Sequence, residues 1–276
     1  MYKHTNARVK KKGMYYANLE RFKTHAGYEI DGAWYPRVTK IVDIKAKPAL
    51  YKFYGEMASF AEGEAVKTQS ASEGTLIHET IEKIMLGDAP VIHPSIRAAV
   101  DAYIQFAEKK NIQTDKEFIE RRIVHHGERY AGTIDALASI DGKFGVLDIK
   151  TSQAIYRDYN LQTSAYVAAL EAEFDNLETR WILRIDQARC CLSCGATLRE
   201  KGGRRKIKLP WKNDNESSVA RECEHEWSEM KGDVELKEFP HWKEDFIAFL
   251  GAKKLWEWEN EYWLRQIGYA TPRTLP

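Results

Sequence analysis

Apolar and polar positions alternate in the middle of the chain and predict a β-hairpin there. Ala138–Ile140 and Phe144–Leu147 are apolar-rich, and Asp141-Gly142 between them is a strong turn signal. Other runs of the same kind predict further strands. The expected strands are Phe118–Val124, Tyr130–Ile140, Phe144–Thr151, Arg180–Ile185 and Val234–Phe239.

Apolar residues at helical spacing predict helices around these strands, and a small hairpin is expected at Tyr28–Tyr35. Strands joined by short turns pair antiparallel, whereas the strand that follows the helix starting near Ile155 should return parallel. This order predicts an α/β fold with a mixed central sheet flanked by helices. The expected helices run from Pro48 to Val66, Gly74 to Leu86, Pro94 to Lys110, Ile155 to Glu173 and His241 to Gln266.

Composition places few limits on function. The 276 residues are 43% hydrophobic and 30% charged, which is typical of a globular protein, and the net charge is +1. A nucleic-acid partner would therefore need local basic patches. The polar start, Met1 to Lys12, and the lack of an 18-residue apolar run predict an intracellular, cytoplasmic protein without a signal peptide. Its four cysteines should then be reduced or bound to metal.

Charged residues interrupt the apolar strand Val146–Ile149. Asp148 and Lys150 share one face, because side chains alternate along a strand, and Asp135 on the partner strand can reach that face. Two carboxylates placed in this way can hold Mg²⁺ or Mn²⁺. The alternative is a weak ion pair on a solvated sheet face. The apolar neighbours favour the metal site, because buried charges are rare unless they are paired or ligate metal.

Two helices carry polar pairs at i, i+4 spacing. His78 and Glu82 lie beside an apolar stripe, and Gly74 before them would let another backbone approach and leave free N–H groups for a phosphate. Gln162 and Tyr166 could hydrogen-bond a phosphate or hold the lysine. Ordinary solvent-facing helix positions are the alternative in both cases.

The order of these residues is more informative than any one of them. It reads G-x-x-x-H, G-x-x-D, D-x-K-T and Q-x-x-x-Y between Gly74 and Tyr166. This order resembles the PD-(D/E)XK nuclease superfamily, in particular its RecB-like exonuclease branch, with CRISPR-associated and phage-encoded members. Tyr35–Thr39 is also similar to the N-terminal region of phage members. The resemblance implies a restriction-endonuclease-like core that hydrolyses phosphodiester bonds.

The resemblance also implies roles for individual residues. It makes the side chains of His78, Asp135 and Asp148, and the carbonyl of Ile149, ligands of a catalytic Mg²⁺ or Mn²⁺. Lys150 matches the catalytic lysine, Gln162 and Tyr166 match the helical motif that follows, and Glu120 is a loosely matching further acid. Many relatives carry an iron–sulfur cluster. None is expected here, because the N-terminal region and the last fifty residues contain no cysteine.

The four cysteines predict a different metal site. All lie between Cys190 and Cys223, and Cys191-Leu192-Ser193-Cys194-Gly195 has the form of a zinc knuckle. Cys223 and His225 would complete a structural Zn²⁺ site, with Cys190 as an alternative ligand to His225. Reduced, unligated thiols are the alternative. We expect a zinc ribbon from about Cys190 to Lys231, inserted between two core strands.

These elements predict three parts. They are an N-terminal hairpin and helical region (1–73), a nuclease core (74–189 and 232–276) and the zinc-ribbon insertion (190–231). Arg204–Lys208 with Trp211 would track a phosphate backbone, or form a solvated basic loop. The aromatic residues Trp256, Trp258, Tyr262 and Trp263 would stack bases or, as the favoured alternative, pack the last helix on the core.

The expected function is that of a divalent-metal-dependent DNA nuclease, an exonuclease acting on DNA ends or single strands in repair or recombination. An endonuclease of the same fold is the nearest alternative. A non-catalytic, zinc-containing nucleic-acid-binding protein is the alternative of a different class, and the intact Asp135, Asp148 and Lys150 argue against it.

Overall fold

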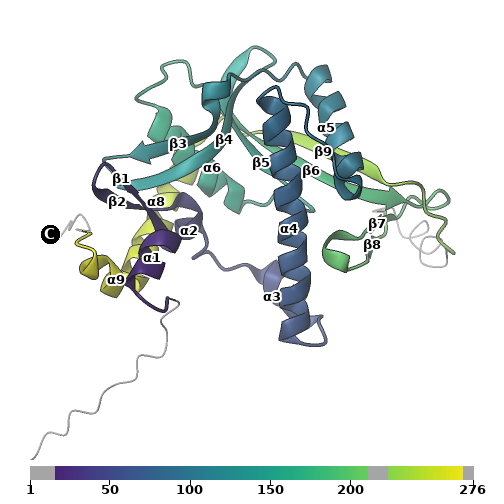
Figure 1. The fold of residues 1–276 in the computed structure, drawn as a ribbon, viewed down its shortest axis with the longest axis horizontal. Coiled ribbons are helices and arrows are strands. Elements are labelled where there is room, and N and C mark those ends of the chain that lie inside the picture. The colour runs from purple at the N-terminus through teal and green to yellow at the C-terminus, as the bar shows by residue number, and fades with distance from the viewer. Residues whose placement is uncertain (1–15, 211–222, 270–276) are drawn as a thin grey trace, which may run out of the picture.

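A single mixed sheet forms the centre of the protein, whose computed structural model describes residues 16–210 and 223–269 (Figure 1). The core strands lie side by side in the order β3, β4, β5, β6 and β9. Two short strands, β7 and β8, extend the sheet from the end of β6. The strands are β3 (Ile119–His125), β4 (Tyr130–Ile140), β5 (Lys143–Lys150), β6 (Thr179–Cys190), β7 (Thr197–Arg199), β8 (Lys206–Lys208) and β9 (Lys231–Glu238).

The pairing of these strands confirms the expected mixed sheet, which is mostly antiparallel. Only β5 and β6 run parallel among the described strands, because α6 (Asp158–Leu170) crosses over between them. Asp141 and Gly142 both have positive φ at the β4–β5 turn, as the predicted hairpin requires. β6 continues five residues beyond the expected Ile185 and carries the chain to the cysteines, and the sequence did not predict β7 and β8.

Helices cover both faces of the sheet and enclose two apolar clusters. On one face, α4 (Phe60–Met85) and α5 (Arg97–Lys109) pack Ile81 and Val100 against Leu147 and Leu183. The other face is covered by α6 and by elements from both ends of the described chain. These are α1 (Leu19–Ala26), the hairpin β1 (Gly27–Ile30) and β2 (Ala33–Pro36), α2 (Val38–Val42), α8 (Lys243–Glu259) and α9 (Glu261–Gln266).

The C-terminal tryptophans divide between core and surface. Trp256 and Trp263 are buried and stack on Phe22 of α1, with ring centroids 6.3 and 5.7 Å away. Trp258 and Tyr262 are exposed. The packing interpretation is therefore confirmed for Trp256 and Trp263, which attach the last helices to the N-terminal elements.

The helix expected from Pro48 to Val66 is interrupted between Gly55 and Phe60, and the helix start expected at Gly74 is wrong. α3 (Pro48–Gly55) ends early, and the Ser59 side chain caps a new helix by accepting a hydrogen bond from the Glu62 N–H. This helix, α4, runs without a break through the polar stretch before Gly74, so the expected domain boundary at residue 73 falls inside it. Gly74 therefore lies inside a helix, and the free N–H groups expected there for a phosphate are absent.

The remaining helical predictions hold apart from their ends. A 3₁₀ turn, η1 (Pro94–Ile96), leads into α5, and another, η2 (Lys116–Phe118), leads into β3. The C-terminal helix is divided at Asn260 into α8 and α9. Within the described ranges, no helix has the length and apolar character needed to cross a membrane.

The insertion between β6 and β9 packs tightly on α4 through the turn η3 (Lys201–Gly203). The Gly202 N–H donates to Glu73 of α4, and Lys201 Nζ donates to the carbonyl of Thr151, just after β5. Gly202 has a φ of +70°, and a Cβ there would overlap Ser70 Oγ and the Val66 carbonyl oxygen. Glycine is needed at 202 for both its backbone conformation and this close approach.

This contact predicts a difference between two glycines of similar conformation. Gly32, at the β1–β2 turn, has φ +74°, and a Cβ added there would have no atom within 4 Å. Gly32→Ala should therefore lower the free energy of unfolding by about 1 kcal/mol, from backbone strain alone. Gly202→Ala should cost clearly more, because the clash adds to the strain. Equal losses in urea unfolding would contradict the packing of η3 on α4.

Candidate functional site

A histidine and two carboxylates meet at one end of the sheet. His78 of α4 has its Nε2 3.3 Å from Asp135 Oδ1 of β4, and its Nδ1 3.9 Å from Glu120 Oε1 of β3. One ligand atom from each of the three residues lies within 4.8 Å of the others. One nitrogen and two carboxylate oxygens at this spacing are suited to a divalent cation such as Mn²⁺ or Mg²⁺.

The backbone of Glu120 is distorted where it joins this group. Its φ is +49°, in the left-handed region that non-glycine residues rarely adopt. The pairs on either side of it, Ile119 with Ala136 and Arg121 with Ile134, keep the regular register of β3 and β4. Such a conformation costs of the order of 1 kcal/mol or more and tends to occur at functional sites. In the sequence, Glu120 is only an acidic residue in an expected strand, which is why it is only a loose candidate for the site there.

The electrostatic effects of this group are strong. The hydrogen bond with Asp135 raises the pKa of His78 to about 9, and this effect outweighs burial. Burial raises the pKa of Glu120 to about 7, and the charge of Asp135 adds to the increase. Burial also opposes ionisation of Asp135, but the hydrogen bond with His78 and the charge of Lys150 lower its pKa overall. His78 and part of the Glu120 population therefore carry protons at neutral pH, and a cation would have to displace them.

Asp148 and Lys150 lie on the same face of β5, as expected, and form an ion pair of 2.6 Å between Oδ2 and Nζ. Asp148 is fully buried, and its Oδ1 accepts a hydrogen bond of 2.9 Å from Gln162 Nε2. Burial raises the pKa of Asp148 to about 6, although Lys150 opposes this shift. The charges of Asp148 and Asp135 keep the pKa of Lys150 raised in spite of its burial.

The expected site residues therefore form two adjacent groups. His78 and Asp135 come together with Glu120, whereas Asp148 is held by Lys150 and Gln162 and does not belong to the group of ligand atoms around His78. The Ile149 N–H links the two groups by donating to Asp135 Oδ2 at 2.5 Å. Gln162 also donates to the Tyr166 hydroxyl at 3.0 Å, so the predicted i, i+4 pair does face the site.

The glycines of the motifs allow close packing at this site. A Cβ on Gly132 would lie 2.6 Å from the Tyr166 ring, and one on Gly74 would lie 2.6 Å from Thr151 Oγ1. The expected close backbone approach at Gly74 is thus present, in the interior of α4. These contacts bring α4, α6 and the ends of β4 and β5 together around the charged residues.

A cavity of about 240 Å³ opens onto the His78 group. Arg37 and Thr39 line it together with Gln162 and Tyr166. Val38 lines it as well, so three residues of the Tyr35–Thr39 segment lie beside the acidic residues. Glu82 is not among the residues lining this cavity.

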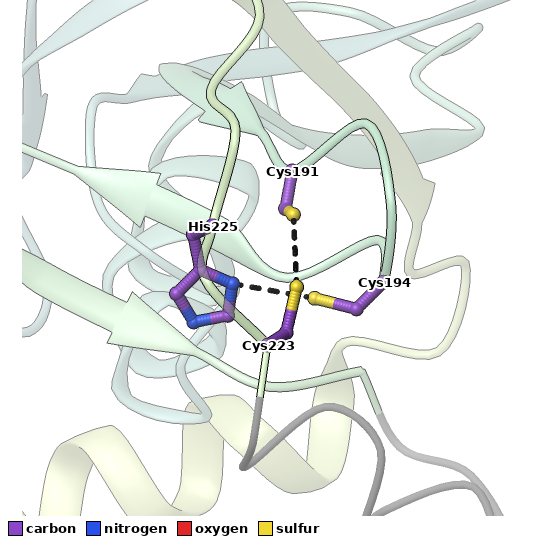
Figure 2. A group of neighbouring side chains, drawn as sticks. All are labelled: Cys191, Cys194, Cys223 and His225. Atoms are coloured by element: carbon purple, nitrogen blue, oxygen red, sulfur yellow. Dashed lines mark hydrogen bonds between the residues drawn. The ribbon is translucent and has the colours of Figure 1, made fainter.

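A second group of metal-ligand residues lies in the insertion (Figure 2). Cys191 Sγ is 3.8 Å from Cys223 Sγ, and Cys194 Sγ is 3.4 Å from His225 Nδ1. Two sulfurs bound to a tetrahedral zinc at about 2.3 Å would lie about 3.8 Å apart. The four ligand atoms lie within 4.8 Å of one another. This Cys₃His group can hold a metal such as Zn²⁺, and it has the ligands expected from the sequence.

The backbone around this group has the form of a knuckle. The Cys191 N–H donates to the Ala196 carbonyl, and Gly195 has a φ of +74° in the turn. The backbone N–H of Cys194 stabilises the Cys191 thiolate and lowers its pKa to about 6. Cys190 does not belong to the group, and its N–H donates to Ser228 Oγ. His225 occupies the fourth position, so the alternative with Cys190 is not needed.

No protein family and no curated protein matches the chain. Among solved structures, "Crystal structure of SSO0001" is similar over 67% of this chain and 71% of that one, at 18% identity and a TM-score of 0.26. A similarity this low does not establish a shared fold or function.

Zinc content tests the Cys₃His group. Protein purified without added metal should contain about one zinc per chain by elemental analysis, and Cys194→Ser should lose it. Cys190→Ser is the matched control and should keep its zinc, because Cys190 lies outside the group. Zinc loss in Cys190→Ser, or zinc-free wild-type protein, would contradict the assignment.

The pKa values predict how Mn²⁺ binding depends on pH. His78, with a pKa of about 9, and Glu120, with a pKa of about 7, must lose protons to ligate a cation. Affinity should therefore rise from about pH 6 to pH 8, and binding should release protons. Calorimetry in two buffers of different ionisation enthalpy measures this release. His78→Gln should release fewer protons, and an affinity independent of pH would argue against this site.

Proposed function

We propose that the protein is a divalent-metal-dependent DNA nuclease, with exonuclease action on DNA ends or single strands. The observation that carries the proposal is the convergence of His78, Glu120 and Asp135 next to the buried Asp148–Lys150 pair. The order of the motifs in the sequence, which resembles RecB-like exonucleases, supports the same chemistry and is the basis for the preference for ends.

Each of these residues has a chemical task in phosphodiester hydrolysis. His78, Glu120 and Asp135 would hold the cation, which supplies neutralisation of phosphoryl charge and a more acidic water. Lys150 would place its ammonium near the phosphoryl oxygens and stabilise the negative charge that develops on them. Asp148 orients Lys150 through their ion pair, and Gln162 fixes Asp148 through its hydrogen bond.

Burial makes this arrangement rigid. Asp148 is fully buried and Lys150 has 18% of its side chain exposed, so solvent screens their interaction weakly. Ile149 lies on β5 between Asp148 and Lys150, and its N–H holds Asp135 of the neighbouring strand β4 in place. Preorganised charges of this kind contribute most where charge develops during a reaction.

Substitutions at the site should separate cleavage from folding. Asp135→Asn and Asp148→Asn should reduce cleavage below detection, and Lys150→Ala should slow it about 10²- to 10³-fold. All three should remain folded by circular dichroism. Asp88→Asn, on the exposed loop after α4, is the matched control and should cleave normally. Undiminished cleavage by Asp148→Asn would contradict the proposal.

Cleavage of different forms of DNA distinguishes the possible modes of action. Purified protein with Mn²⁺ should degrade linear or single-stranded DNA and leave covalently closed circles intact. Cleavage of closed circles would indicate an endonuclease of the same chemistry. Binding of DNA without cleavage of any substrate would indicate a non-catalytic protein.

A further inference from the structure

A larger cleft of about 830 Å³ lies beside the site, and Lys150 and Thr151 form part of its wall. Of the described residues that line it, eight are lysine or arginine and two are acidic. The two acids already have partners, since Glu56 pairs with Arg204 at 2.9 Å and Asp158 lies 3.6 Å from Lys45. Three of the basic residues also pair with acids outside the lining, Lys47 with Asp43, Lys150 with Asp148 and Arg199 with Asp186. A positive excess remains after these pairs are counted, although the net charge of the whole chain is only +1.

Aromatic rings accompany this positive charge. Phe53, Tyr156 and Tyr159 line the cleft, and Tyr156 has 41% of its surface exposed. Lys150 Nζ lies 5.2 Å from the centre of the Tyr159 ring, so the aromatic residues reach the lysine of the site. Basic side chains that follow a phosphate backbone, combined with rings on which bases stack, are typical of sites for single-stranded nucleic acid.

The insertion supplies half of the basic side chains. Arg199, Lys201, Arg204 and Lys206 all line the cleft, opposite α3. The insertion is attached to α4 through Gly202, as described above, and reaches across to α3. There the Arg204 guanidinium pairs with Glu56 and lies 5.3 Å from the centre of the Phe53 ring.

The Cys₃His group draws its residues from both ends of the insertion. Cys191 and Cys194 precede β7, whereas Cys223 and His225 lie just before β9. A metal bound by all four residues would fix the start and the end of the insertion relative to each other. The basic residues 199–206 lie in the part of the chain between these two ligand pairs.

We propose that the cleft binds a single strand of DNA and leads it to Lys150, with residues 199–206 of the zinc-held insertion as the outer wall. The inference rests on the proposed function for the chemistry at the end of this path. The volume of the cleft is in the range that encloses a small organic ligand. It can hold a few nucleotides of one strand, whose unpaired bases would stack on the aromatic rings.

Strand binding without cleavage tests the proposal. Fluorescence anisotropy with a labelled poly-dT oligonucleotide, without chelator and without added Mg²⁺ or Mn²⁺, measures affinity while any nuclease lacks its cation and the structural zinc stays bound. Lys52→Gln/Lys206→Gln, in two exposed cleft lysines on opposite walls, should weaken binding about tenfold at about 0.1 M salt. The slope of log K against log salt should fall by about 1.4, for two lost phosphate contacts. Lys109→Gln/Lys254→Gln removes two exposed lysines that do not line the cleft and should change neither value.

The zinc-held wall is tested separately. Cys194→Ser should also weaken oligonucleotide binding about tenfold, while Mn²⁺ binding at the His78 group stays unchanged and reports an intact core. A blunt duplex of the same length should bind wild-type protein more weakly than the single strand does.

The outcomes distinguish this inference from the proposed function. Weakened binding by the cleft variants supports the strand path, even if no substrate is cleaved. Wild-type cleavage combined with equal affinities of the cleft and control variants would overturn the strand path and leave the nuclease proposal standing. The path is also overturned if wild-type protein does not bind the oligonucleotide, or if Cys194→Ser binds it normally.

Discussion

The ion pair between Asp148 and Lys150 is the constraint on which the site depends. A carboxylate inside the apolar strand β5 is costly to bury and is tolerated only with compensating partners. Lys150 supplies the opposite charge at 2.6 Å, and Gln162 supplies a hydrogen bond from α6. The crossover helix α6 and the sheet are therefore joined by a polar contact in addition to apolar packing. This contact fixes the distance between Lys150 and the residues around His78.

The same strand connects the two halves of the site. Ile149 lies between Asp148 and Lys150, and its N–H donates to Asp135 on β4. Asp135 in turn holds His78 of α4, which packs on the opposite face of the sheet from α6. A substitution at any of these residues should alter the position or the charge state of the others. Substitution effects at Asp135, Asp148 and His78 should therefore not add independently, as is usual for groups in one network.

Much of this arrangement follows from local sequence patterns. The Asp141-Gly142 turn sets the register of β4 and β5, and the alternation of side chains then places Asp148 and Lys150 on one face. The spacing of Cys191, Cys194, Cys223 and His225 likewise identifies the second metal-ligand group. Side-chain alternation, turns and ligand spacing depend on residues close together in the sequence, so they can be predicted without a structure.

Features that depend on contacts between segments far apart in the sequence cannot be predicted in this way. α4 continues through residues 67–73 because its polar stretch packs against η3 of the insertion, far along the chain. The left-handed backbone of Glu120 likewise depends on its position opposite Asp135 and His78. The basic cleft combines α3, the segment after β5 and the insertion, and no stretch of sequence shows all three together.

Anomalous scattering from crystals grown with Mn²⁺ would test the central claim most directly. Data collected on either side of the manganese edge locate manganese separately from any zinc. The account predicts a manganese peak among His78, Glu120 and Asp135, on the side of the sheet where Asp148 and Lys150 meet. Absence of manganese from this position in crystals that bind it elsewhere would contradict the account.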